Sequence, residues 1–123
     1  MTSATLIGFS DNEFNPMTAT LAVNGYKVLR NKRVAEIQPD EVTFVSGDRP
    51  NWLETVRQIR AVHPRAFLVV VTRLPDSDKW LDALEAGADD YCSMPLDKRQ
   101  IQWLSRLNNQ VSSPAGARVA GGI

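Results

Sequence analysis

Phe67-Leu68-Val69-Val70-Val71-Thr72 is the stretch that decides the fold class, because it is apolar at successive positions up to the final threonine. A strand with one face in water alternates apolar and polar residues, whereas a strand covered on both faces is apolar throughout. The stretch therefore predicts a central strand of a parallel sheet that has helices on both faces.

Short apolar runs alternate with amphipathic segments on both sides of this strand. The other predicted strands are residues 5–9, 26–29, 42–45 and 91–94. Predicted helices begin at Asn15, within residues 31–38, at about Trp52, at Pro75 and after Asp97. Five strand–helix units in sequence predict a doubly wound α/β sheet, whose ligand sites lie at the carboxyl ends of its strands.

Local signals place the ends and faces of three helices. Asn15 is predicted as an N-cap, because the proline that follows it is favoured at the first helical position. Residues 31–38 have room for only about two helical turns. In the helix that begins at Pro75, Leu81 and Leu84 are predicted to face the core, with Trp80 at the edge of their stripe.

Composition and charge are those of one ordinary globular domain. The chain has 123 residues, of which 43% are hydrophobic and 23% charged, and 14 basic residues balance 14 acidic ones. No net charge therefore points to nucleic acid or anionic lipid as a partner. A single cysteine, Cys92, excludes an internal disulfide and suits a reducing cytoplasm.

Membrane and targeting signals are not found in the sequence. The longest apolar run is far shorter than the roughly 20 residues that span a bilayer, and the N-terminus lacks the pattern of a signal peptide. We expect a cytoplasmic domain over residues 1–111. Residues 112–123, which include Pro114 and Gly116, are predicted to be a flexible tail or the start of a linker.

A second stretch resembles a known family. Ala83-Leu84-Glu85-Ala86-Gly87-Ala88-Asp89-Asp90-Tyr91, followed by Met94-Pro95-Leu96-Asp97, resembles the end of the receiver domain of bacterial response regulators. Asn24-Gly25-Tyr26-Lys27-Val28 and Ile59-Arg60 are similar to other parts of these domains. The resemblance implies a CheY-like, flavodoxin-like sheet of five parallel strands in the order 2-1-3-4-5. It also implies a cis peptide bond before Pro95.

The resemblance further implies a phosphorylation site at the strand ends. In receivers, two acidic residues after the first strand and an aspartate at the end of the third hold Mg²⁺, and that aspartate accepts the phosphoryl group. A threonine or serine after the fourth strand and a lysine before the fifth-strand proline bind the phosphoryl oxygens. These five positions fall here on Ser10, Asp11, Ser46, Thr72 and Met94.

Three of the five positions have lost the residue that the chemistry needs. Ser10 leaves a carboxylate at only one of the two acidic positions, Asp11, Ser46 is no acyl-phosphate acceptor, and Met94 carries no charge to neutralise a phosphoryl group. The resemblance therefore implies a degenerate phosphorylation site, with no catalytic residue, no metal and no cofactor. The expected function is that of a phosphorylation-independent receiver in two-component-type signalling, which is not an enzyme and binds other proteins.

Two other functions stay open. Asp48 follows Ser46 and Gly47 and can act as an alternative acceptor, in which case the chain is a working receiver. A small flavin or nucleotide binder on a flavodoxin-like sheet is the third possibility. Against it, the loops after the first and third predicted strands have no hydroxyl- or glycine-rich run that would hold a phosphate.

The partner surface is predicted from the last two helices and the strand between them, which form the usual binding face of receivers. Trp80, Tyr91 and Trp103 are expected there, with Lys79, Lys98 and Arg106 around them. Exposed tryptophans are enriched at interface hot spots. Tyr91 matches the aromatic residue that moves between buried and exposed positions in receivers, although a strand tyrosine with one wet edge fits equally well. The expected occupant is a signalling or regulatory protein or a second copy of the chain, with no nucleic acid and no membrane.

Overall fold

The computed structural model describes residues 2–30, 33–38, 41–94 and 96–110. Five parallel strands form one sheet in the order β2-β1-β3-β4-β5. The strands are β1 (Thr2–Ile7), β2 (Tyr26–Arg30), β3 (Val42–Ser46), β4 (Phe67–Thr72) and β5 (Asp90–Ser93). The helices are α1 (Asp11–Val23), α2 (Trp52–Val62), α3 (Ser77–Ala86) and α4 (Lys98–Gln110), with a 3₁₀ turn η1 (Val34–Glu36). The predicted doubly wound α/β fold and its strand order are confirmed.

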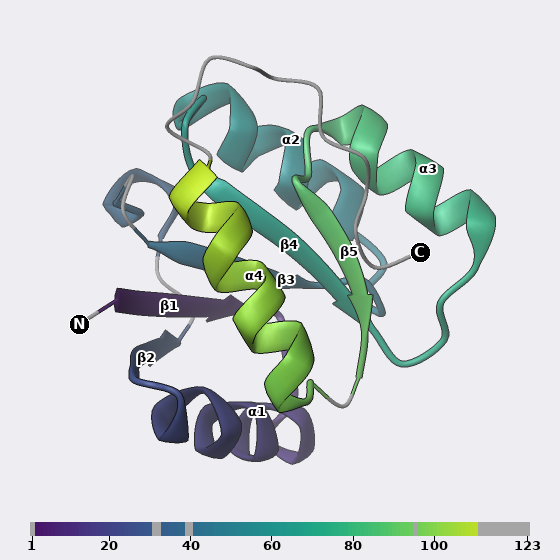
Figure 1. Cartoon of the computed structure of the whole chain (residues 1–123). Coiled ribbons are helices and arrows are strands. Elements are labelled where there is room, and N and C mark those ends of the chain that lie inside the picture. The colour runs from purple at the N-terminus through teal and green to yellow at the C-terminus, as the bar shows by residue number, and fades with distance from the viewer. Residues whose placement is uncertain (1, 31–32, 39–40, 95, 111–123) are drawn as a thin grey trace.

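Two apolar clusters fill the space between the sheet and its helices. Figure 1 shows α4 crossing in front of the sheet and α2 behind it. On one face, α1 and α4 bury Met17, Leu21, Ile101 and Leu104 against the strands. On the other face, α2 and α3 pack with Ile37 against alternate residues of the same strands. All six residues of β4 are buried, and its side chains divide between the two clusters, as the apolar run predicts.

The short second helix is also confirmed, because η1 has only three residues. The bond before Pro95 and the segment 112–123 lie outside the described residues. Within the part of the chain that the structure describes, no helix has the length and apolar character needed to cross a membrane.

The predicted start of the first helix is wrong. The helix begins at Asp11 rather than after Asn15, and Pro16 lies inside it. Ser10 is the N-cap, and its backbone N–H donates to Glu13 Oε1 at 2.9 Å. A glutamate at the third helical position satisfies the N–H of the capping residue in this way. The interior proline removes one intrahelical donor, which the helix tolerates.

The predicted phase of the helix that follows β4 is wrong as well. Leu81 is 48% exposed, whereas Trp80 packs against the cluster under α2 and α3, and Ala83 is fully buried. The helix begins as predicted, with Asp76 as the N-cap that accepts a hydrogen bond from the backbone N–H of Lys79 at 2.7 Å. The side that packs against the cluster is that of Trp80 and Ala83, which lie three residues apart on one face.

Candidate functional site

The candidate site lies where β1, β3 and β4 end, at the carboxyl edge of the sheet. Ser46 is the last residue of β3 and pairs in register with Val71 of β4. Thr72 ends β4, and its side chain and that of Ser46 are buried. The structure therefore brings these two sequence-predicted positions to one edge, as expected for a parallel sheet.

Asp48 is the acidic residue that reaches Thr72. Its Oδ1 accepts a hydrogen bond from Thr72 Oγ1 at 2.5 Å, and its Oδ2 accepts one from the backbone N–H of Arg73 at 3.0 Å. Ser46 takes no part in this contact, and its Oγ only accepts a 3.4 Å bond from the N–H of Asp48. The carboxylate at the centre of the site is thus two residues beyond the position that the resemblance assigns.

Gly47 explains how Asp48 comes so close to β4. The N–H of Gly47 donates to Val71 O at 2.8 Å, so the chain stays paired with β4 past the end of β3. A Cβ at position 47 would lie 2.9 Å from Val70 Cγ1 and 3.3 Å from Thr72 Cβ. Only glycine lets the backbone approach β4 to this distance, and Asp48 is then placed beside Thr72.

Two cations that were not predicted at the site face the Asp48 carboxylate. Lys79 Nζ lies 3.7 Å from Oδ1 and also donates to Thr72 Oγ1 at 3.4 Å, while Arg73 Nε lies 3.5 Å from Oδ2. Met94, where the resemblance implies a lysine in receivers, is partly buried against the cluster under α1 and α4. Arg73 follows Thr72 directly and could have been placed at the site from the sequence. Lys79 reaches it from the first turn of α3.

These contacts set the protonation state of Asp48. Burial by itself would raise the pKa of this carboxyl group, but the hydrogen bonds from Thr72 and the Arg73 N–H, with the charges of Lys79 and Arg73, lower it below its ordinary value. Asp48 is therefore an anion at neutral pH, held by two donors and two cations.

Asp11, the one acidic residue at the two positions that the resemblance assigns after the first strand, pairs elsewhere and not at Asp48. Asp11 lies at the start of α1 and pairs with Arg30 of β2 at 2.6 Å, and its side chain is 79% exposed. The carboxylate that α1 turns toward the site is Glu13, whose Oε2 lies 3.2 Å from Arg73 Nε. Glu13 was not predicted at the site, because the resemblance assigns the two acidic positions to Ser10 and Asp11. The hydrogen bond from the Ser10 N–H to Glu13 Oε1 holds this side chain inward, and a capping pattern of this kind is the sequence signal that could have found it.

The residues at this edge do not fit Mg²⁺. The cation requires near-octahedral oxygen ligands at about 2.0–2.1 Å, whereas Glu13 and Asp48 both face a guanidinium and Asp11 is paired elsewhere. Among the described residues there is also no group of three or more histidine, cysteine, aspartate or glutamate side chains that could hold a metal ion.

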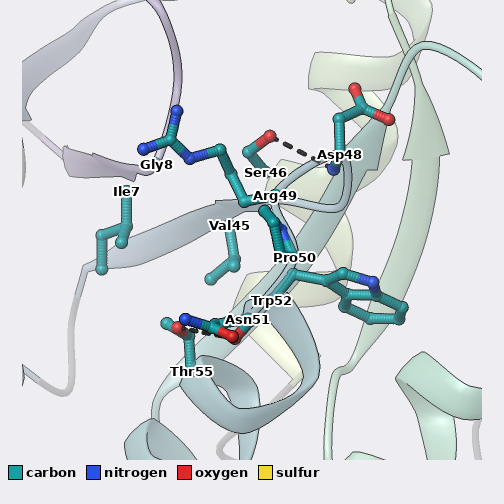
Figure 2. A pocket seen from close by; sticks show the side chains of 10 residues that line it. All are labelled: Ile7, Gly8, Val45, Ser46, Asp48, Arg49, Pro50, Asn51, Trp52 and Thr55. Atoms are coloured by element: carbon teal, nitrogen blue, oxygen red, sulfur yellow. Dashed lines mark hydrogen bonds between the residues drawn. The ribbon is translucent and has the colours of Figure 1, made fainter.

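A cavity of about 490 Å³ opens beside this cluster, between the ends of β1 and β3 and the start of α2. Figure 2 shows Ser46 and Asp48 at one end, Asn51 and Thr55 at the other, and the Arg49 side chain reaching toward β1. This is the crevice in which doubly wound sheets bind ligands. The charged residues that line it are Asp48, whose carboxylate faces Arg73 and Lys79, and Arg49.

Tyr91 and Cys92 are interior residues of β5. The Tyr91 ring is 1% exposed and its hydroxyl accepts a hydrogen bond from the backbone N–H of Asp76 at 3.1 Å. Burial is the main cause that raises the pKa of this hydroxyl. Burial, with the nearby Asp90 carboxylate, also raises the pKa of Cys92 to about 12, so this cysteine is a thiol within the core at neutral pH.

The three aromatic residues of the predicted partner surface lie in different surroundings. Trp80 is partly buried beside α2, Tyr91 is buried, and Trp103 on α4 is 38% exposed. Trp103 and Trp80 belong to helices on opposite faces of the sheet. Of the three, only Trp103 presents a large exposed surface, so the outer side of α4 is the part of the predicted face that remains available.

No family model matches the chain. Over 79 residues it is 35% identical to a protein-glutamate methylesterase/protein-glutamine glutaminase from Nocardioides sp., a match that covers 62% of this chain and 21% of that protein. The chain thus spans about a fifth of this relative. It is also 24% identical over 89 residues to the chemotaxis protein CheY of Thermotoga maritima, covering 71% of this chain and 72% of that protein.

Solved structures have the same fold. A CheY-like response-regulator receiver domain protein from Methanospirillum hungatei superposes with a TM-score of 0.76 at 15% identity, covering 90% of this chain and 96% of that one. A protein from Burkholderia pseudomallei, described as pilus assembly-related, has a TM-score of 0.74 at 22% identity, covering 89% and 91%. The chain therefore has the CheY-like receiver fold.

Proposed function

We propose that the chain is a cytoplasmic receiver-type module of two-component signalling that binds a protein partner and works without phosphorylation. The observation that carries this proposal is the Asp48 carboxylate, which already accepts from Thr72 and the Arg73 N–H and faces Lys79 and Arg73. These are the donors and charges that would otherwise bind an incoming phosphoryl group.

Phosphoryl transfer to Asp48 would have to break these contacts first. The reaction depends on positioning and on charge stabilisation, which a metal ion commonly supplies. Here each carboxylate that faces the site is neutralised by a side chain of the same protein. An attack by Asp48 would therefore begin from a paired, stabilised anion and without a suitable Mg²⁺ ligand set.

One specific observation favours the rival function, in which Asp48 is a working acceptor. Asp48 lies against a hydroxyl and a lysine ammonium, and Lys79 supplies a cation that Met94 cannot. The two functions make opposite predictions for a chemical phosphodonor, so one experiment separates them.

Incubation with acetyl phosphate and Mg²⁺ is expected to leave the intact mass of the protein unchanged. The reason is that the Asp48 carboxylate already accepts hydrogen bonds from Thr72 and the Arg73 N–H. The site also lacks a complete set of Mg²⁺ ligands, because Glu13 pairs with Arg73. Intact-mass spectrometry at neutral pH measures the result, with a phosphorylatable receiver domain as positive control. A labile adduct that is present in the wild type and absent in Asp48→Asn would establish the rival function instead.

We propose the outer side of α4 as the partner-binding surface. Trp103 is exposed there, and its exposed neighbours on the same helix include the cations Lys98, Arg99 and Arg106. The buried side of the helix is occupied by Ile101 and Leu104. An aromatic centre with a cationic rim fits a protein surface that carries acidic residues, and this proposal includes a second copy of the chain as the alternative occupant.

Trp103→Ala is expected to weaken self-association or partner binding by roughly 2 kcal/mol if Trp103 is a hot spot, while the unfolding temperature changes little. Multi-angle light scattering and a pull-down against the partner measure association. Gln102→Ala, an exposed change on the same helix, is the matched control. Unchanged association with a large loss of thermal stability would show that Trp103 serves the core, and the proposed surface would then be wrong.

A further inference from the structure

Two carboxylates from distant parts of the chain share one guanidinium at the carboxyl edge of the sheet. Glu13 Oε2 and Asp48 Oδ2 lie 3.2 Å and 3.5 Å from the same nitrogen, Arg73 Nε. The two acidic side chains are only 13% and 12% exposed, whereas Arg73 is 65% exposed. The cation therefore lies on the solvent side of two nearly buried anions that come from α1 and from the loop after β3.

Such a pair of carboxylates requires a cation. Two neighbouring anions in a poorly solvated place repel each other, and one of them takes up a proton unless a positive charge lies close by. Glu13 is held in place by the N–H of Ser10 and Asp48 by Thr72 and the Arg73 N–H, so neither can easily turn away into solvent. A positive charge between them is thus part of the folded structure.

An arginine meets this requirement in a different way from a metal ion. The guanidinium is planar, stays charged at all ordinary pH values and needs little dehydration to contact two carboxylates. It is also attached to the chain, so its presence does not depend on the concentration of a cation in solution. Asp11, which could have completed an oxygen ligand set, is paired with Arg30 instead.

We infer that Arg73 takes the place of a divalent cation between Glu13 and Asp48, so that this edge of the fold carries its own counterion and does not respond to Mg²⁺. The inference deepens the proposed function, since a receiver that is independent of phosphorylation has no need of the metal. It also predicts that a cation site lies hidden beneath Arg73 and is uncovered when that side chain is shortened.

Thermal unfolding in EDTA and in MgCl₂ or MnCl₂ at matched ionic strength tests the inference. The wild type is expected to unfold at the same temperature in all three. Arg73→Ala is expected to unfold at a lower temperature in EDTA and to regain part of the loss when Mg²⁺ or Mn²⁺ is added. Its affinity for Mn²⁺ in a calorimetric titration should exceed that of the wild type by about tenfold or more, because Mn²⁺ no longer competes with the charge of a guanidinium for the two carboxylates.

Three further variants identify the site. The double change Arg73→Ala with Glu13→Gln is expected to lose the response to the cation. Arg73→Lys is expected to respond to the cation less than Arg73→Ala, because the positive charge is kept, and to recover only part of the stability, because an ammonium lacks the planar guanidinium. Arg49→Ala is the matched control, since Arg49 is an exposed arginine near the same edge whose side chain makes no hydrogen bond or ion pair among the described residues.

Two results would overturn the inference. One is a wild type that Mg²⁺ stabilises as much as it stabilises Arg73→Ala. The other is an unfolding temperature of Arg73→Ala that does not rise with Mg²⁺ or Mn²⁺, or that still rises when Glu13→Gln is added to the same protein. Neither result bears on phosphorylation, which the acetyl phosphate experiment decides separately through a covalent adduct.

Discussion

Arg60→Ala is expected to lower the free energy of unfolding by about 3 kcal/mol or more, the cost typical of removing one partner of a buried ion pair. Arg60 Nη2 pairs with Asp89 Oδ2 at 2.8 Å, and both side chains are largely buried, at 23% and 14% exposed. The same guanidinium donates to the backbone carbonyls of Pro64, Ala66 and Gly87 at 2.7–2.9 Å. The substitution leaves these acceptors and the carboxylate without their common donor.

Arg60 also has a packing function. A Cβ at position 87 would lie 2.8 Å from Arg60 Cγ, so the aliphatic part of the arginine rests directly on Gly87. Gly87 caps α3 in the left-handed conformation, at φ 114°, and cannot be replaced there without strain. Arg60 therefore connects α2, the end of α3 and the start of β4.

Thermal or urea denaturation measures this effect, which corresponds to a fall in unfolding temperature on the order of 10 °C for a domain of this size. Arg60→Lys should recover only a part of it, because an ammonium cannot donate in the fixed fork of a guanidinium. Arg57→Ala, an exposed change on the same helix, is expected to alter stability little. Equal losses for Arg57→Ala and Arg60→Ala would show that the Arg60 contacts contribute nothing specific.

Asp48→Ala is expected to cost about 2 kcal/mol of stability. The carboxylate accepts two hydrogen bonds, and such bonds to charged groups each contribute roughly 1.5–3 kcal/mol, from which the cost of burying a carboxylate that is only 12% exposed is subtracted. The loss should be concentrated where β3 and β4 end and α3 begins, since Thr72 and Lys79 lose their common partner. Hydrogen exchange of the Arg73 and Leu74 amides locates it. Asp82→Ala, at an exposed position of α3, is the control.

The pH dependence of stability gives an independent measure of Asp48. Its pKa is lowered in the folded protein, so folding favours the carboxylate form. Its contribution is fully present above the unfolded aspartate pKa of about 3.9 and is lost as the pH falls through the lower folded value. Asp48→Asn is therefore expected to be less stable than the wild type at neutral pH and to lose less stability on acidification. Parallel acid-denaturation profiles for the two proteins would contradict this.

The fold could be predicted from the sequence because it depends on signals that lie close together along the chain. The apolar run of β4, the alternation of strands with amphipathic segments and the glycine that ends α3 each report burial or backbone conformation at their own position. The residue types at positions 10, 46 and 94 are likewise read directly from the sequence.

The start of α1 and the buried face of α3 escaped prediction for different reasons. Ser10 with Glu13 decides where α1 begins, and the competing signal Asn15-Pro16 is equally good in the sequence. In α3 the cap at Asp76 agrees with the predicted start, but the face that packs against the cluster is that of Trp80 and Ala83 rather than that of Leu81.

The sequence by itself determined that the chain folds as a doubly wound sheet and which residue types stand at the positions that the resemblance assigns to phosphorylation. Only the tertiary structure decided which side chains meet at the ends of its strands. Asp48 meets Thr72 across 24 residues, and Arg73 joins it to Glu13. The contact between Asp48 and Thr72 depends on how closely the loop after β3 approaches the end of β4. That approach is possible because Gly47 has no Cβ. Periodicity and composition report whether a side chain is buried, but the partner it meets is fixed by the packing of strands and loops that are distant in the sequence.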